Sequence, residues 1–349
     1  MRRLFLILLF FIIACVVSAQ KMEGDTTYYR KYNNKLIISY FQSYKSFGID
    51  MSQKLKPDTL GQSTIVNIAE ANLVSGFEIT YDKISVSIGF KSPSTLSDKK
   101  GNTSYKNFAL NIGGNKWILE NSYRSYMGFY NKNTVAYDTS FYSTGIFDQF
   151  PSLKAEAYKT KFLLFKNPEL FSFRSGYTGN YQQIKSAFSW VYSANIYYNK
   201  LNSDSSFFPF QIRTYYDNHR NMNGLNVFAF SICAGGSLNI VIWKALFANL
   251  TLIGGPEQQW RTYRYLDNYN NSTLSYLSLT GDARGSLGLN FKKWYILING
   301  TTDFSFYSIS KITFNSKYNS GNFTLGFRFG VKTPKFYSKF QKTKLYNKL

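Results

Sequence analysis

The sequence predicts an all-β protein: an antiparallel up-and-down transmembrane β-barrel of about fourteen strands, with about twelve to sixteen compatible with the pattern. Three observations predict this fold. Apolar and polar residues alternate over long runs, two-residue turns switch the parity of that alternation, and aromatic residues make up 19% of a chain whose mean hydropathy is slightly negative. Such a composition is expected where every second side chain meets lipid and the others meet water.

The clearest pattern lies in the runs Leu277–Phe291 and Trp294–Phe306. Apolar residues and glycines occupy the odd positions of the first run and mainly the even positions of the second. A two-residue turn at Lys292–Lys293 requires this switch, and it places Asp282 opposite Asp303 on the polar face. Both runs exceed the about five or six residues of ordinary strands. The alternative is a long hairpin of a soluble sandwich whose apolar face covers a core.

Similar runs continue along the chain, and tight turns alternate with longer loops. This alternation is typical of barrels with short periplasmic turns and long outer loops, and it places both termini on the periplasmic side. Residues 45–72 are expected to be mainly a loop, although 64–71 could hold a short extra strand. The expected strands span residues 35–44, 73–81, 84–90, 108–112, 117–129, 152–166, 170–176, 186–199, 207–215, 225–242, 246–252, 277–291, 294–306 and 323–330.

The ends of the chain differ from the barrel. Two arginines, an apolar run and Val17-Ser18-Ala19 predict a cleaved secretory signal peptide. A second interpretation is lipoprotein processing at Cys15. The last segment has six lysines and no acid, and we expect it to be mobile. The predicted division is a signal peptide at 1–19, a polar lead-in at 20–34, the barrel at 35–331 and a basic tail at 332–349.

Charged residues on the inward-facing parity of these strands predict a lumen-lining charged ladder. Opposite charges spaced along one face suit a hydrated lumen better than a dry core. The ladder could line a solute path or bind a ligand, or it could be a salt-bridged filling that hydrates and stiffens the barrel. Its predicted members are Glu78, Glu120, Arg124, Arg174, Asp282, Arg284, Asp303 and Arg328. Aromatic residues beside the tight turns predict a periplasmic girdle at the membrane interface: Tyr81, Trp117, Trp243 and Trp294.

The sequence offers little material for catalysis or for metal binding. It has one histidine, His219, and after signal removal one cysteine, Cys233, so no internal disulfide is expected. His219 near Asp217 is the only candidate base, and a solvated turn rich in Asn and Asp explains that segment better. No glycine pattern of a nucleotide-binding loop follows a strand. We therefore expect no enzyme activity, no catalytic residues, no cofactor and no metal.

The formal charge of +22 indicates anionic partners. Behind an export signal these are lipid head groups, lipopolysaccharide phosphates or anionic solutes rather than nucleic acid. The predicted location is the bacterial outer membrane. The leading functional hypothesis is passive passage or binding of small polar or anionic solutes. The alternative is a non-conducting structural or interaction barrel that engages lipopolysaccharide, peptidoglycan or a protein partner.

One segment also carries a resemblance to a known family. Residues 171–199, FSFRSGYTGNYQQIKSAFSWVYSANIYYN, together with the signal ending Ser-Ala-Gln and with residues 25–28, DTTY, are similar to an uncharacterised family of Bacteroidota outer-membrane proteins, domain of unknown function 4421. The resemblance spans most of the mature chain. It implies an outer-membrane barrel, and it implies no known activity.

Overall fold

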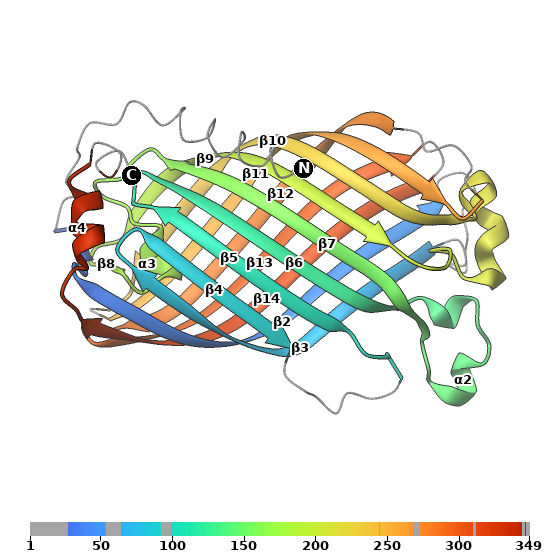
Figure 1. Cartoon of the computed structure of the whole chain (residues 1–349), viewed down its shortest axis with the longest axis horizontal. Coiled ribbons are helices and arrows are strands. Elements are labelled where there is room, and N and C mark those ends of the chain that lie inside the picture. Colours follow the sequence, from blue (N-terminus) through green and yellow to red (C-terminus); the bar gives the residue numbers. More distant parts are fainter. Residues whose placement is uncertain are drawn as a thin grey trace.

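A closed barrel of twelve antiparallel strands forms the body of the protein (Figure 1). The computed structural model describes residues 27–53, 64–91, 99–243, 245–267, 273–309, 312–343 and 346. The predicted all-β antiparallel barrel is confirmed, and its wall has twelve strands, the lower end of the expected range. The predicted signal peptide and Cys15 lie outside the described residues.

Each wall strand pairs with its neighbour in the sequence, β7 pairs with β9, and β14 pairs with β2 to close the ring. β4 and β5 are short, so beyond the ends of these two strands β3 pairs directly with β6. The wall strands are β2 (Lys35–Gln53), β3 (Thr64–Tyr81), β4 (Ile84–Lys91), β5 (Ser104–Gly113), β6 (Trp117–Asn131), β7 (Asp148–Phe165), β9 (Ala187–Asn202), β10 (Met222–Val241), β11 (Leu246–Tyr265), β12 (Thr273–Asn290), β13 (Trp294–Ile309) and β14 (Ile312–Gly330).

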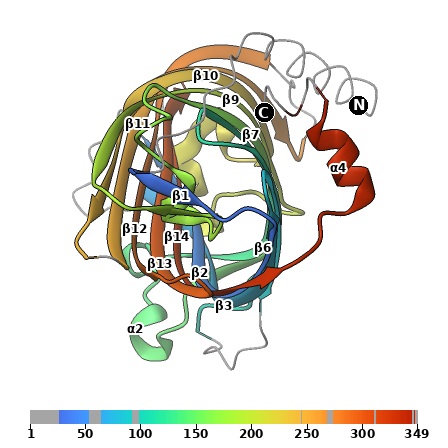
Figure 2. The same cartoon turned by 90° about the vertical axis from the view of Figure 1, so that its left-hand side faces the viewer.

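Shorter elements lie inside the barrel and at its ends. β1 (Tyr29–Lys31) and β8 (Tyr181–Gln183) form a separate two-stranded sheet. Figure 2, which looks into one end of the barrel, shows β1 lying within the ring of wall strands. The remaining elements are the helices η1 (Thr134–Ala136), α2 (Phe141–Thr144), α3 (Arg174–Tyr177), η2 (Phe210–His219) and α4 (Lys335–Gln341).

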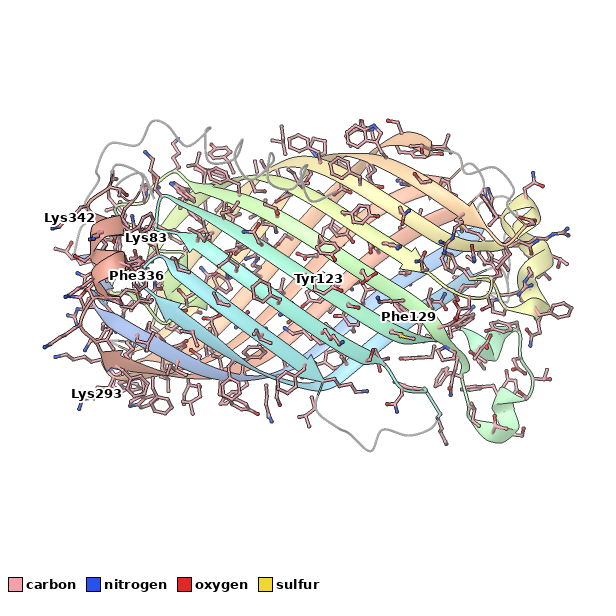
Figure 3. All side chains as sticks on the ribbon, viewed as in Figure 1. Lys83, Tyr123, Phe129, Lys293, Phe336 and Lys342 are labelled. Carbon is pink, nitrogen blue, oxygen red and sulfur yellow. The ribbon has the colours of Figure 1, made fainter. Side chains whose placement is uncertain are left out.

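The register of the β12–β13 hairpin is the predicted one. Asp282 pairs with Asp303, and Arg284 pairs with Thr301. The turn at Asp82–Lys83 behaves in the same way, because Tyr81 pairs with Ile84 across it. Figure 3 labels Lys83 and Lys293 at the same end of the barrel. We call this the short-turn end, and we call the opposite end, which carries α2 and η2, the long-loop end.

The outer face of the wall carries an exposed apolar belt. Its side chains lie at alternate positions of the strands, and soluble monomers rarely expose an apolar surface of this extent. Hydrocarbon is the environment that suits such a closed wall, since its backbone groups are paired around the ring. Members of the belt include Ile38, Phe77, Ile79, Ile88, Phe90, Phe108, Ile232, Leu250, Leu252, Leu277, Leu279, Leu287, Ile298, Phe323 and Phe327. Among the helices that the structure describes, none has the length and apolarity needed to cross a membrane.

Two expected strands, 170–176 and 207–215, are wrong, and they account for the excess over twelve. The first lies in the connection between β7 and β9, where Phe171 and Phe173 are buried against side chains of the inner wall. The second contains the helix η2, preceded by Pro209. In the first segment, Phe171 and Phe173 alternate with polar residues because they pack inside the barrel, not because they face lipid. In the second segment, Phe207 and Phe208 are likewise buried inside.

Several wall strands extend into expected loops. β2 continues to Gln53, and its apolar side chains Phe47, Ile49 and Met51 lie inside the barrel. In the first half of the same strand, Ile38 and Tyr40 lie outside. Apolar side chains therefore face outward in the first half of this strand and inward in the second half. In the sequence, this change looks like the end of the strand. β3, β11 and β14 extend beyond their expected limits as well.

The C-terminal tail, which was expected to be mobile, contains the helix α4 docked at the short-turn end (Figure 1). Tyr337 of α4 is buried, and its ring lies 5.0 Å from the ring of Tyr81. Its hydroxyl donates to Asp82 Oδ2 at 3.0 Å. The prediction of mobility rested on the lysine content alone and did not consider the aromatic residues by which the segment docks.

Candidate functional site

Eight charged side chains form a belt around the inside of the barrel near mid-height. They come from β2, β6, β7, β12 and β13, whose inward-facing positions meet across the lumen. We call this group the charged belt. Its members are Lys45, Glu120, Arg124, Lys159, Lys161, Asp282, Arg284 and Asp303, of which all but three were predicted as members of the ladder.

Arg284 is the centre of one half of the belt. Its Nη1 and Nη2 donate to the two carboxylate oxygens of Glu120 at 2.8 Å each, a bidentate pair between β12 and β6. Its Nε donates to Asp282 Oδ1 at 2.9 Å, and Lys161 forms an ion pair with the other oxygen of Asp282. Bidentate charge-assisted hydrogen bonds fix both distance and orientation. This half of the belt is therefore a rigid network.

Asp303 is the centre of the other half. Lys159 Nζ lies 3.0 Å and Arg124 Nη1 3.5 Å from its Oδ2. The guanidinium of Arg124 also lies 3.7 Å from the ring centroid of Tyr318, a cation–π contact. The opposed carboxylates Asp282 and Asp303 thus each have a lysine of β7 as a partner. Two like charges placed in register need such cations between them.

Lys45, Lys159 and Lys161 are the belt members that sequence reasoning missed. Lys159 and Lys161 share the parity of Ala155, Ala157 and Leu163 on β7, which is the inward parity in the structure. That shared parity is the feature of the sequence from which the inward direction of the two lysines could have been predicted. Lys45 lay in an expected loop. Its Nζ donates to Ser320 Oγ at 2.6 Å and to Asn322 Oδ1 at 2.5 Å, both neutral groups.

The belt holds two more cations than carboxylates, five against three. One further carboxylate, Glu257, lies beside it and accepts a hydrogen bond from Ser305 Oγ at 2.6 Å and another from Gln259. Arg261 Nε in turn donates to Gln259 Oε1 at 2.8 Å, so Glu257 has a cation of its own close by. Even when Glu257 is counted with the belt, five cations face four carboxylates, so a positive excess of one remains.

Two cavities lie along the belt, and Arg124, Lys159 and Lys161 line both of them. The first has a volume of about 70 Å³ and extends toward β9, where Asn195 lies on its wall. The second has a volume of about 200 Å³, and Lys45 lies on its wall. The shared lining residues make the cavities two compartments of one charged space.

The other predicted ladder residues lie nearer the short-turn end. Glu78 accepts a hydrogen bond from Thr80 Oγ1 at 3.2 Å. Arg174 was expected on a strand, but it lies on α3, where it donates to the carbonyl of Gly113 and, at 3.1 Å, to Ser85 Oγ. Arg328 donates to Asn290 Oδ1 at 2.6 Å. These three residues do not belong to the charged belt.

Arg174 and Arg328 help to hold a plug in the short-turn end. We define the plug as β1 together with residues 166–186, which include α3 and β8. Arg328 Nε donates to Gly179 O at 2.5 Å, and its guanidinium lies 4.0 Å from the ring centroid of Tyr32, the residue that follows β1. Further bonds join the plug to the wall, from Asn239 Nδ2 to Ser172 O at 2.8 Å and from Tyr177 OH to Asn249 Oδ1 at 2.6 Å. Figure 2 shows β1 of the plug within the ring.

A segment that we call the lid packs into the long-loop end. We define it as residues 206–219, which contain η2, the yellow helix at the right of Figure 1. Phe207, Phe208, Ile212 and Tyr216 are buried in one apolar cluster with inward-facing residues of the wall, among them Phe47, Met51 and Tyr126. The rings of Phe208 and Tyr216 stack with their centroids 3.9 Å apart. The charged belt therefore lies between a plug and a lid.

His219 lies at the end of the lid. Its Nδ1 is 2.7 Å from Tyr265 OH, and the two rings are stacked at 6.0 Å. The side chain of Asp217 lies outside the described residues. Within the described parts of the chain, no three His, Cys, Asp or Glu side chains come together in a group that could hold a metal ion.

Three of the four predicted girdle aromatics lie at the outer surface of the short-turn end. Trp243 is 71% exposed, Trp294 packs on Phe291 with centroids 4.4 Å apart, and Tyr81 contacts α4. Trp117 is buried against Phe162. A second aromatic row, which the sequence did not suggest, follows the register across the wall farther toward the long loops: Tyr123, Tyr158, Tyr198, Phe228 and Trp260.

Asp82, in the turn between β3 and β4, links the plug to the tail. Lys31 of the plug lies 2.6 Å from its Oδ1, and the hydroxyls of Tyr337 and Tyr346 donate to its Oδ2. Burial alone would raise the pKa of Asp82, but the charge of Lys31 and these hydrogen bonds hold this pKa below its ordinary value. The ionised carboxylate thus ties three segments together.

A family model described as "Domain of unknown function (DUF4421)" matches residues 23–329. No curated protein sequence matches the chain. Among solved structures, the outer membrane protease OmpT from Escherichia coli is 8% identical with a TM-score of 0.36, over 86% of this chain and 98% of that one. The toluene transporter TbuX of Ralstonia pickettii is 7% identical with a TM-score of 0.30, over 85% and 90%. The translocator domain of the autotransporter NalP from Neisseria meningitidis is 13% identical with a TM-score of 0.35, over 84% and 88%. These likenesses are too low to carry an argument about activity.

Proposed function

The chain belongs to the family described as Domain of unknown function (DUF4421), and from the lumen of this member we propose an outer-membrane barrel that binds small anionic solutes and admits them when its lid opens. The observation that carries the proposal is the positive excess of the charged belt. Lys45 in particular lies among neutral partners. An uncompensated buried cation is costly, and a bound anion removes that cost.

The enclosure of the belt strengthens this argument. Water screens charges less in a small space between a plug and a lid than at an open surface, so an anion there interacts strongly with several cations at once. Arg124, Lys159 and Lys161 line both cavities, so an anion in either one lies close to them. The binding of one small anion fits both the charge excess and the volumes.

In the proposed arrangement, residues 1–19 direct export and are removed, and the short-turn end faces the periplasm. The lid then faces the outside of the cell, and solutes enter past it. The outer surface of the wall contacts membrane lipids and lipopolysaccharide. No catalytic step is part of the proposal.

Equilibrium dialysis of the purified barrel in detergent against labelled inorganic phosphate tests binding. Overnight dialysis allows for slow entry past the lid. We expect saturable binding that weakens as salt is added, and an affinity at least about tenfold lower for Lys45→Gln, because one charge-assisted contact is lost. Lys100→Gln is the matched control, since Lys100 pairs with Glu70 at the outer surface. Absence of saturable phosphate binding to the wild-type barrel would contradict the proposal.

The closure of both ends also supports a second candidate, a non-conducting structural or interaction barrel. Recording across a planar bilayer separates the two candidates. Solute passage predicts discrete openings whose reversal potential in a salt gradient indicates anion selectivity, with lower selectivity for Lys45→Gln. A membrane that stays electrically silent under voltage, even with the lid variant Phe208→Ala/Tyr216→Ala, would remove passage and leave the non-conducting role.

A further inference from the structure

The wall of the first cavity carries hydrogen-bond acceptors without donors. Ser193, Asn195 and Asn199 of β9 line this cavity, and each is less than a tenth exposed. Among the described residues, no group bonds to Ser193 Oγ, Asn195 Oδ1 or Asn199 Oδ1. Asn195 Nδ2 donates to Ser231 Oγ at 2.8 Å, which holds the amide with its oxygen free. This side of the cavity therefore presents acceptor oxygens that a ligand with hydrogen-bond donors could satisfy.

The neighbouring strands β6 and β7 carry side chains that call for an acceptor. These are Arg124, Lys159 and Lys161, all of which also face the second cavity, and Lys161 is the cross-strand partner of Asn195. Asp303 presents one oxygen to Lys159 and Arg124, while its Oδ1 has no partner among the described residues. A ligand in the first cavity thus meets cations and free acceptor oxygens on neighbouring strands.

We propose that the lumen is selective for small hydroxylated organic anions, such as polyol phosphates and sugar acids. This inference rests on the proposed function and names its substrate class. The anionic group of such a molecule pairs with the cations, and its hydroxyls donate to the free oxygens of β9. A simple inorganic anion supplies the first interaction and little of the second. Phe47 and Ile253, which also line the first cavity, offer apolar contact to the carbon chain.

The energetic basis of the selectivity is the cost of leaving buried acceptors without donors. Each such group loses its bonds to bulk water on burial, and a ligand hydroxyl restores one bond. Two restored bonds suffice for a difference of about tenfold or more in affinity. Neutral polyols satisfy the same oxygens but leave the positive excess of the charged belt uncompensated, so they bind weakly.

Overnight equilibrium dialysis of the full-length mature barrel against glycerol 3-phosphate, inorganic phosphate and glycerol tests the inference. We expect glycerol 3-phosphate to bind at least about tenfold more tightly than phosphate, and glycerol to show no saturable binding. Asn195→Leu removes the acceptor at similar volume. It should abolish most of the advantage of glycerol 3-phosphate over inorganic phosphate, and the ratio of the two affinities measures that loss.

Matched variants separate this inference from the proposed function. Ser189→Ala changes a buried residue of the same strand that does not line the cavity, and it should leave all affinities unchanged. Asn199→Leu provides a second acceptor deletion if Asn195→Leu fails to fold, as judged by heat-modifiable gel migration. Phosphate binding that equals glycerol 3-phosphate binding would overturn the inference while the proposed function stands. If neither anion binds, both fall, and if glycerol binds as tightly as its phosphate, the anionic part of the inference is wrong.

Discussion

The plug at the short-turn end and the lid at the long-loop end close the same lumen by different interactions. The plug is joined to the wall by packing of Phe171 and Phe173 and by directional hydrogen bonds, of which those of Arg328 and Arg174 are charge-assisted. The lid is held mainly by burial of aromatic and aliphatic side chains such as Phe208 and Tyr216. Hydrogen bonds tolerate little displacement, whereas apolar contacts can slide and repack. The lid is accordingly the better candidate for a part that opens.

The largest effect is expected when the apolar packing of the lid is removed. Removal of a buried aromatic side chain costs about 3–5 kcal/mol, so Phe208→Ala should raise the population of the open lid by about 100-fold or more. Trypsin cleavage after Arg213 measures this opening, and exchange protection of the plug should stay unchanged. Phe210→Ala is the control, because Phe210 lies in the same helix and is 83% exposed. Equal cleavage rates for the two variants would show that apolar burial does not hold the lid.

The next effect is at the plug. Arg328→Met removes charge-assisted hydrogen bonds to Gly179 O and Asn290 Oδ1, which are worth roughly 1.5–3 kcal/mol each. Amide hydrogen exchange of residues 170–183 should become at least about tenfold faster, since part of this cost appears as local opening. The lid should remain resistant to trypsin. If exchange in the plug is unchanged, the plug is held by packing, and the contrast with the lid disappears.

The smallest expected effect is at the tail. The pKa of Asp82 is held below its ordinary value, so its stabilising contribution is present above that value and is lost as pH falls through the lowered pKa. Pepsin cleavage near Phe336 should therefore begin to rise only at strongly acidic pH. The Asp82→Asn variant should be cleaved at the same high rate from pH 4.5 downward. A wild-type rise at pH 4.5 would show that Asp82 does not hold the tail.

The difference between the two ends also explains what could be predicted from the sequence. The β12–β13 register was predictable because apolar residues face lipid along most of both arms and a two-residue turn fixes the pairing. In the outer half of β2, Phe47 and Met51 face inward against the lid, so the apolar parity reverses. A rule that apolar residues face lipid therefore fails wherever the lumen itself has an apolar filling.

The charged belt was predictable on strands with unambiguous parity and not elsewhere. Asp282 and Arg284 followed from the hairpin register, and Arg124 from its own strand. Lys161 lies on a strand whose apolar face was not assigned, and Lys45 lay in an expected loop. Residues 170–176 of the plug were predicted as a strand because Phe171 and Phe173 alternate with polar residues, although both are buried. Pro209, by contrast, was a visible argument against a strand at the lid.

A crystal structure of the barrel grown in bromide tests the central claim most directly, because bromide scatters anomalously and reports where anions bind. The account predicts an anomalous peak inside the closed lumen, within contact of Lys45 or Arg124, and its loss in Lys45→Gln/Arg124→Gln crystals. Bromide found only on the outer surface, with the belt cavities holding water alone, would contradict it.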